Sequence, residues 1–284
     1  MDTKKVALVT GSTDGLGRGA ARLLAEQGWH VVVHGRDPRK VAAVLAEVRA
    51  VGHGSAVTAD FAHLEQVHAL ADEVLAAHGR LDALVNNAGV ATPNHRARTR
   101  GVTPDGYQTE WQVNFLAAFA LTLRLTGLLA GSAPARVVNV SSIAQGWGEI
   151  NWPDLQLERH WDRMAAYAQS KLALTAFTNE YAARLAGHGV SANSLHPGMC
   201  STKMVRSTFI LAPHRSRYGS ENIVRLVTGQ EYDRISGVYL NERKQIAPNA
   251  FAHDTAGRRK LWGVALSQSG VEGRADLLPE LLRA

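Results

Sequence analysis

The stretch that decides the fold spans residues 6–17 and reads VALVTGSTDGLG. A short apolar run typical of a buried strand comes first, a glycine-rich turn follows it, and a helical pattern begins at residue 16. Glycines let this turn bring its backbone close to a pyrophosphate, and the helix N-terminus offers free N–H groups to the anion. An ordinary strand–helix turn is the alternative. We expect a dinucleotide to bind at Gly11, Ser12, Thr13, Asp14, Gly15, Leu16 and Gly17.

Strand-like and helical segments alternate along the rest of the chain. Strands are expected at residues 6–10, 30–34, 54–58, 83–86, 136–140, 190–195 and 237–240. Helices are expected at residues 16–27, 38–51, 63–78, 104–130, 162–187, 217–228 and 254–268. This alternation predicts the α/β class, with a single Rossmann-type doubly wound parallel sheet of about seven strands and helices on both faces.

No change of composition divides the 284 residues, so we expect one dinucleotide-binding catalytic domain over residues 1–284. Residues 143–161 and 199–216 do not fit the simple alternation. Each segment follows a strand and should therefore lie at the carboxyl edge of the sheet, where ligands bind in this architecture. We interpret both segments as insertions that shape the substrate site.

Composition excludes several classes of protein. The single cysteine, Cys200, rules out an internal disulfide and a cysteine-based zinc site. His30 and His34 lie four apart in a strand, about 13 Å from one another, so they cannot share a metal, and we expect none. The net charge of +6 comes from scattered basic residues, which argues against a nucleic-acid partner. We found no apolar run of about 18 residues and no signal-like N-terminus, so we expect a cytoplasmic protein without a membrane partner.

The end of the second expected strand indicates which dinucleotide binds. A carboxylate usually holds the ribose 2′-hydroxyl of NAD at this point, but here the chain has Gly35 and then Arg36. A guanidinium suits a 2′-phosphate, so NADP(H) is favoured over NAD(H). Asp37 is better interpreted as a helix cap. Asp60, followed by Phe61, should contact the adenine, although Asp60 also has the pattern of a helix N-cap.

Further motifs follow in a fixed order. After the glycine-rich turn come Asn86-Asn87-Ala88-Gly89, Asn114, Ser142, Tyr167-x-x-x-Lys171 and Pro197-Gly198. Together they resemble the short-chain dehydrogenase/reductase family over about residues 5–245. The detailed likeness is to its retinol dehydrogenase-like branch, as a soluble member of the bacterial type. It rests on the stretches Thr103-Pro104-Asp105-Gly106, Val138-Asn139-Val140-Ser141-Ser142, Ser170-Lys171-Leu172-Ala173 and His196-Pro197-Gly198.

The resemblance implies a catalytic group. Tyr167 and Lys171 lie one helical turn apart, so the lysine ammonium should lower the pKa of the tyrosine and make it an acid/base. Ser142 matches the family serine that holds the substrate oxygen, with Ser141 as the alternative. Asn114 matches the residue that fixes a water for proton relay to the lysine. The resemblance also assigns cofactor contacts to Tyr167 and Lys171 themselves, and to Asn87, Ala88, Gly89, Pro197, Gly198 and Thr202.

These residues predict NADPH-dependent reduction of a carbonyl, or oxidation of the matching alcohol. The alternative is an NADP(H)-binding regulator or scaffold without turnover. Family members often pair through the helices that carry Asn114 and Tyr167, so a homodimer or homotetramer is a further expectation.

The insertions suggest the nature of the substrate. Twenty-five positions separate Ser142 from Tyr167, and the added residues are rich in tryptophan. Beside the catalytic serine and tyrosine, we expect Trp147, Trp152, Met199 and Met204 to line a site for a lipophilic small molecule. Phe209, Ile210 and Leu211 should face them. The alternative is that these side chains only pack the insertions onto the body of the protein.

Overall fold

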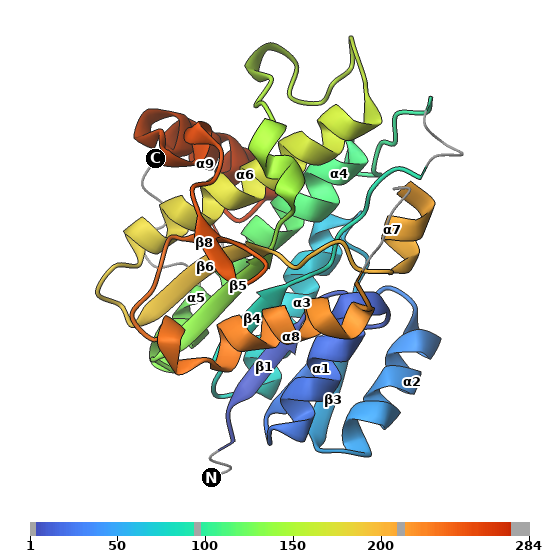
Figure 1. The fold of residues 1–284 in the computed structure, drawn as a ribbon, viewed down its shortest axis with the longest axis vertical. Helices are drawn as coiled ribbons and strands as arrows, with labels where there is room; N and C mark the ends of the chain where they lie inside the picture. The colour runs from blue at the N-terminus through green and yellow to red at the C-terminus, as the bar shows by residue number, and fades with distance from the viewer. Residues whose placement is uncertain (1–3, 94–97, 209–213, 274–284) are drawn as a thin grey trace.

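Eight strands form one sheet in the computed structural model, which describes residues 4–93, 98–208 and 214–273 (Figure 1). Their spatial order is β3-β2-β1-β4-β5-β6-β7-β8, and all neighbours are parallel except β7 and β8. The strands are β1 (Val6–Val9), β2 (His30–Gly35), β3 (His53–Thr58), β4 (Ala83–Asn86), β5 (Ala135–Val140), β6 (Val190–His196), β7 (Tyr239–Asn241) and β8 (Lys244–Ile246). The Rossmann-type α/β fold is confirmed.

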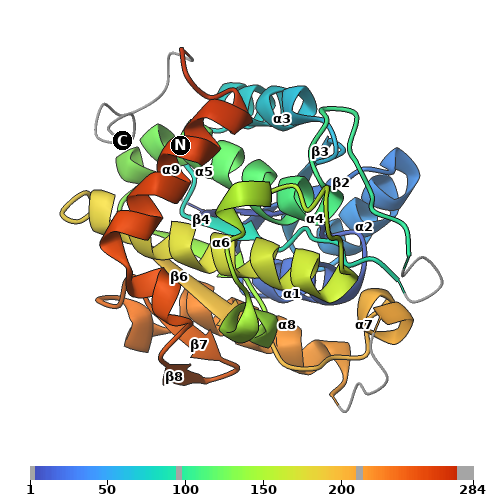
Figure 2. The ribbon, with the colours of Figure 1, turned by 90° about the horizontal axis from the view of Figure 1, so that it is seen from above.

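Helices cover both faces of the sheet. They are α1 (Gly15–Glu26), α2 (Pro38–Arg49), α3 (Leu64–Ala77), α4 (Thr109–Trp111), α5 (Ala117–Gly131), α6 (Arg163–Arg184), α7 (Lys203–Thr208), α8 (Ser216–Thr228) and α9 (Thr255–Ser269). One apolar core lies between the sheet and α1, α2 and α8, and the other lies under α3, α5, α6 and α9 (Figure 2). Because both faces are buried, β1 is apolar at all four positions and β2 carries three consecutive buried valines, as the runs of valine predicted.

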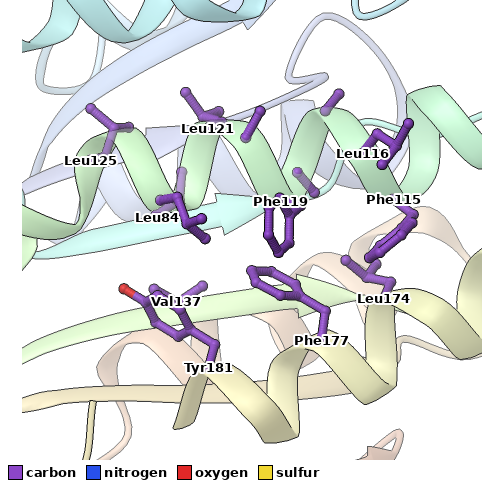
Figure 3. Close-up of a cluster of buried hydrophobic side chains, with 14 of the residues drawn as sticks. Leu84, Phe115, Leu116, Phe119, Leu121, Leu125, Val137, Leu174, Phe177 and Tyr181 are labelled. Atoms are coloured by element: carbon purple, nitrogen blue, oxygen red, sulfur yellow. The ribbon is translucent and has the colours of Figure 1, made fainter. Parts of the chain in front are cut away.

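The second core is centred on aromatic side chains of α5 and α6 (Figure 3). Phe119 lies 5.1 Å from Phe177 and 5.1 Å from Trp262 of α9, measured between ring centroids. The Arg184 guanidinium lies 4.3 Å from the centroid of the Trp262 ring, on the outer side of α6. Helix α9 therefore packs against both α5 and α6 within the same chain.

The helix expected over residues 104–130 begins later and is not regular. Gly106 has a φ of +88° and belongs to a turn closed by the Thr103 N–H, which donates to the Tyr107 carbonyl. Helix α4 starts only at Thr109, and a π-helical segment, η2 (Gln112–Leu116), separates it from α5. The run Thr109–Gly131 is long and apolar enough to cross a membrane, but most of it is buried inside the molecule. That burial accounts for its composition.

Two other boundaries differ from the prediction. Gly237 has a φ of +77° and precedes β7, which begins at Tyr239. The antiparallel strand β8 was not expected, because its sequence, Lys-Gln-Ile, has no buried apolar alternation. Residues 199–216 also contain an unexpected short helix, α7, and a bridge between Cys200 and His214.

Candidate functional site

The glycine-rich turn lies where β1 and β4 end side by side. Gly11 has a φ of +62°, and a Cβ built there would lie 2.8 Å from the Ala88 Cα. A Cβ on Gly17 would lie 2.3 Å from the Asn87 Nδ2. No side chain fits at either position, so the glycines are required by backbone geometry and by close approach.

Asn87 ties this turn to β4. Its Nδ2 donates to the carbonyls of Thr10 (2.8 Å) and Gly11 (3.2 Å). The Thr10 hydroxyl oxygen accepts from the N–H groups of Asn87 and Ala88. The Asn87 side chain was expected to line the cofactor. Its Nδ2 group donates instead to the backbone of the turn. It therefore acts on the cofactor site by holding the turn in place.

Ser12 also faces inward. Its side chain is fully buried, and its Oγ accepts from the His34 N–H (2.9 Å) and lies 3.2 Å from the His34 carbonyl, to which it donates. The Ser12 side chain is therefore bonded to β2, and the place of Ser12 in the cofactor-binding turn stays a prediction. Phe61 is similarly buried, with its ring stacked 4.6 Å from the ring of His34.

His34 is a part of the site that sequence reasoning missed. Its Nδ1 accepts from the Gly11 N–H (3.1 Å), and its Nε2 lies 3.1 Å from the Ala59 carbonyl. Burial lowers the pKa of His34 to about 4, with smaller opposing effects from the Ala59 bond and the Asp60 charge. The ring is therefore neutral near pH 7. Only its position at the end of β2, next to the turn, could have indicated this role.

The first turn of α1 is open to an anion. The Asp14 carboxylate caps the helix by accepting from the Gly15 N–H (2.7 Å). The N–H groups of Leu16 and Gly17 have no hydrogen-bond partner among residues 4–93, 98–208 and 214–273. Unpaired first-turn amides of this kind suit a phosphate oxygen. The turn therefore fits the diphosphate of a dinucleotide.

At the end of β2, Arg36 is exposed. Its side chain makes no hydrogen bond or ion pair within the described part of the chain. Asp37 caps α2, as expected, by accepting from the N–H groups of Arg39 (2.9 Å) and Lys40 (3.4 Å). Asp60 accepts from the Ala62 N–H (3.0 Å) in the turn before α3, whose N-cap is His63. Asp60 is therefore not the cap of the helix itself.

Two neighbouring serines after β5 point in different directions. The Ser141 hydroxyl is buried against α6, 2.8 Å from the Thr175 Oγ1 and 3.1 Å from the Lys171 carbonyl. The Ser142 side chain instead forms a hydrogen bond with the side chain of Tyr167. The structure therefore supports Ser142, and not Ser141, as the partner of the tyrosine.

Tyr167 and Lys171 both lie on α6 and are buried. The Lys171 Nζ donates to the Val140 carbonyl (2.9 Å) and lies 5.8 Å from the centroid of the Tyr167 ring. Burial lowers the pKa of Lys171 to about 8. Burial also raises the pKa of Tyr167 above its ordinary value, and the bond to Ser142 only partly opposes this effect. The predicted lowering of the tyrosine pKa is therefore wrong for the cofactor-free chain, because desolvation outweighs the distant ammonium.

Asn114 lies in the π-helical segment. Its Oδ1 accepts from the Val90 N–H (2.7 Å), and its Nδ2 donates to the Val90 carbonyl and the Ser170 hydroxyl (2.9 Å each). Ser170 in turn donates to the Tyr167 carbonyl (2.8 Å). The amide thus joins the chain after β4 to the helix that carries the catalytic pair. These bonds join the side chain to other groups of the protein, and the water expected at Asn114 stays a prediction.

The first insertion divides the predicted substrate residues. It begins with a 3-10 turn, η3 (Ile143–Trp147), directly after Ser142. Trp147 is 59% exposed and Ile143 is 41% exposed. Trp152 belongs to η4 (Trp152–Asp154), and its ring lies 4.1 Å from the Lys260 Nζ of α9. Trp147 is thus available to a ligand, whereas Trp152 packs the insertion onto the body of the protein.

The C-terminal part of the chain holds this insertion in place. Asn249 donates from its backbone N–H to the Gln145 Oε1 (2.9 Å), and from its Nδ2 to the carbonyls of Gly146 (3.2 Å) and Gly148 (3.0 Å). Sequence reasoning missed this contact because about a hundred positions separate the partners.

The second insertion begins at Pro197 and Gly198. Gly198 has a φ of +102°, and Thr202 lies against the glycine-rich turn, 3.1 Å from a Cβ built on Gly15. Met199 and Met204 are both half-buried. Of the predicted apolar residues in this segment, Phe209, Ile210 and Leu211 lie outside the described residues.

Ala88 and Gly89 continue the edge of β4 toward the catalytic pair. A Cβ on Gly89 would lie 3.1 Å from the Asn114 Oδ1 and 3.4 Å from the Lys171 Nζ. Ala88 is partly buried against the second core. The predicted cofactor residues and the predicted catalytic residues therefore meet along one edge of the sheet.

Comparison with known proteins is consistent with this arrangement. Residues 5–210 match the family model described as short chain dehydrogenase. Retinol dehydrogenase 13 of Mus musculus is 33% identical, with 97% of this chain and 88% of that protein aligned. Retinol dehydrogenase 12 of Bos taurus is 35% identical over 94% of this chain and 87% of that protein.

Solved structures show the same fold. A putative uncharacterized protein from Mycobacterium Paratuberculosis is similar with a TM-score of 0.76 and 28% identity, covering 93% of each chain. The RhlG/NADP active-site complex from Pseudomonas aeruginosa has a TM-score of 0.68 and 25% identity, covering 84% of this chain and 94% of that one.

The buried histidines predict a loss of stability in acid. Burial lowers the pKa of both His34 and His196 to about 4, from 6.5 in an unfolded chain. Between these values the unfolded chain binds more protons, so stability is present above pH 6.5 and is lost as the pH falls toward 4. Each residue should account for roughly 3 kcal/mol of that loss.

Urea unfolding between pH 7 and pH 4.5 measures this effect. His34→Asn should flatten the dependence of the unfolding free energy on pH, and the matched change His53→Asn on exposed β3 should leave it as it is. Equal pH dependence in the wild type and in His34→Asn would contradict the assignment.

Proposed function

Because the chain belongs to the short-chain dehydrogenase family, we propose that it uses NADP(H) to interconvert a lipophilic carbonyl compound and the matching alcohol. The family and the relatives make the chain an NAD(P)-dependent oxidoreductase that acts on CH–OH groups. The observation that carries the proposal is the hydrogen bond between Ser142 and Tyr167, with Lys171 buried beside them.

The residues of the turn fit a nicotinamide dinucleotide. The Leu16 and Gly17 amides of α1 would hold the diphosphate, and Thr202 lies beside them. Lys171 would bond the ribose next to the nicotinamide. When bound, the nicotinamide supplies or accepts the hydride of the reaction.

The chain itself handles the proton. Ser142 would donate a hydrogen bond to the substrate oxygen and hold it beside the Tyr167 hydroxyl. Tyr167 gives its proton to that oxygen in reduction and takes it back in oxidation. Lys171, with a pKa of about 8, is mostly charged at pH 7 and stabilises the negative charge that develops on the tyrosine oxygen. Because the pKa of Tyr167 is raised, the tyrosine carries its proton at neutral pH and is ready for reduction.

The end of β2 supports NADP(H). The Arg36 guanidinium is exposed and has no partner within the described residues. The nearest carboxylate in the sequence, Asp37, is bonded to the first turn of α2 and does not compete for it. A planar guanidinium can form two charge-assisted bonds with a 2′-phosphate.

The first insertion supports a lipophilic substrate. Trp147 and Ile143 expose apolar surface immediately after Ser142. A ligand that covers these side chains would be stabilised by about 25 cal/mol for each Å² of apolar surface removed from water. Relatives named for retinol, an apolar alcohol, agree with this class of substrate.

Substitutions in the catalytic group test the mechanism. Tyr167→Phe removes the acid/base and should lower kcat by roughly 10²–10⁴-fold. Ser142→Ala removes a donor to the reacting oxygen and should lower kcat by about 10²-fold. Ser141→Ala is the matched control, and it should stay within a few-fold of wild type because its hydroxyl faces α6. Steady-state kinetics measure kcat, and cofactor fluorescence should show unchanged binding in Ser142→Ala and Ser141→Ala.

A second test concerns the cofactor. Arg36→Ser should weaken NADPH binding by roughly 10- to 100-fold, since it removes hydrogen bonds to a charged group, and should leave NADH binding unchanged. The control Arg39→Ser alters an exposed arginine three positions further along, on α2. Fluorescence titration gives both dissociation constants. Equal affinity of the wild type for NADPH and NADH would contradict the preference.

A third test concerns the substrate. For aldehydes of increasing apolar length, the kcat/KM of the wild type should rise, by about fourfold for each methylene that is buried. Trp147→Ala should reduce this slope, whereas Trp152→Ala should preserve it because Trp152 packs against α9. A flat series in the wild type would rule out a lipophilic substrate. Binding of NADPH without turnover of any aldehyde, ketone or quinone would favour the regulator or scaffold instead.

A further inference from the structure

His34 contacts the glycine-rich turn through its ring, and this contact is distinct from those of its backbone. The backbone N–H and carbonyl of His34 pair with Ser12, and any residue at this position could do the same. The ring Nδ1 reaches the N–H of Gly11 at 3.1 Å. Gly11 is therefore held on both sides, since its carbonyl accepts from the Asn87 Nδ2 (3.2 Å).

The partners of the ring allow only one protonation state. A backbone N–H can only donate, so the Nδ1 beside Gly11 must carry a lone pair. A carbonyl can only accept, so the Nε2 beside Ala59 must carry the proton (3.1 Å). His34 is 2% exposed, and its ring is stacked on the ring of Phe61. The nearest charge acting on it is that of Asp60, in the turn after β3.

We propose that His34 is a positioning residue for the cofactor: as the neutral Nε2–H tautomer it holds Gly11, and with it the turn, in the conformation that receives the diphosphate. The inference rests on the proposed function, because it concerns the same cofactor site. If the free turn adopts this conformation for only a fraction of the time, the apparent Kd rises by the inverse of that fraction. The bond to Gly11 keeps the fraction close to one.

Two variants separate positioning from packing. His34→Phe keeps an aromatic ring for Phe61 but leaves the Gly11 N–H without an acceptor. His34→Asn gives up the ring but offers an amide oxygen near the position of Nδ1. If His34 only packs against Phe61, His34→Phe should keep the cofactor affinity better than His34→Asn does. If His34 positions the turn, His34→Asn should keep the affinity better. His34→Gln is a further control, because its longer amide reaches toward Ala59 rather than Gly11.

Cofactor affinity and stability should therefore change in opposite order. We expect the Kd for NADP⁺, measured by calorimetry, to rise about tenfold in His34→Phe and His34→Gln and to stay near wild type in His34→Asn. In steady-state kinetics, His34→Phe should raise the KM for the cofactor by a larger factor than it lowers kcat. Urea unfolding should show His34→Phe to be at least as stable as His34→Asn. Wild-type affinity in His34→Phe, or weaker binding in His34→Asn than in His34→Phe, would overturn the proposal.

Measurements on the cofactor-free protein keep this inference separate from the proposed function. Nitrogen-15 NMR of the His34 ring should show the Nε2–H tautomer at pH 7, and amide exchange of Gly11 should be faster in His34→Phe than in His34→Asn. If the wild type binds no nicotinamide cofactor, the proposed function fails, and exchange at Gly11 still decides the role of His34. A charged His34 ring, or the Nδ1–H tautomer, would overturn the proposed role of His34.

Discussion

A parallel sheet buried on both faces imposes one constraint on everything else in this molecule. Each strand from β1 to β6 must be followed by a crossover, so the turns that follow these strands leave the sheet at the same carboxyl edge. The helices that follow the neighbouring strands β1 and β4 lie on opposite faces of the sheet. Helix α1 covers one face, and α5, which follows β4, covers the other. The edge between these two strands is consequently not covered by a helix, and the glycine-rich turn and the catalytic group face each other across it.

The site is assembled by polar bonds that are themselves buried. Asn87 and His34 hold the Gly11 peptide from its two sides, and Asn114 connects the end of β4 to α6 through Ser170. Buried polar groups are favourable only when all partners are present, so such networks specify one geometry. Lys171 is the costly member, since burial disfavours its charge. In the proposed mechanism, this charge stabilises the negative charge that develops on the Tyr167 oxygen.

The sequence was sufficient for the order of the first seven strands and most of the helices, because hydrophobic periodicity and glycine positions are local signals, but it did not predict β8 or α7. Boundaries that depend on single backbone angles, as at Gly106 and Gly237, carried no such signal. The sequence did not reveal that the Ser12 hydroxyl bonds to β2 or that Trp152 packs against α9, because each contact joins distant parts of the chain. The pKa of Tyr167 was predicted from one neighbour, whereas burial from all directions determines it. His34 could not be recognised, since its role depends on Ala59 and Gly11 approaching it together.

The bonds from Asn249 to the loop after Ser142 can form only late in the synthesis of the chain. A chain emerging from the ribosome presents its amino-terminal half first, and domains begin to fold as they emerge. The strands β1 to β5 can pair while the last fifth of the protein is still being translated. The loop that carries the catalytic serine lacks its anchor until residue 249 has left the exit tunnel. The newborn protein can therefore complete its nucleotide-binding half before it acquires a finished reaction centre.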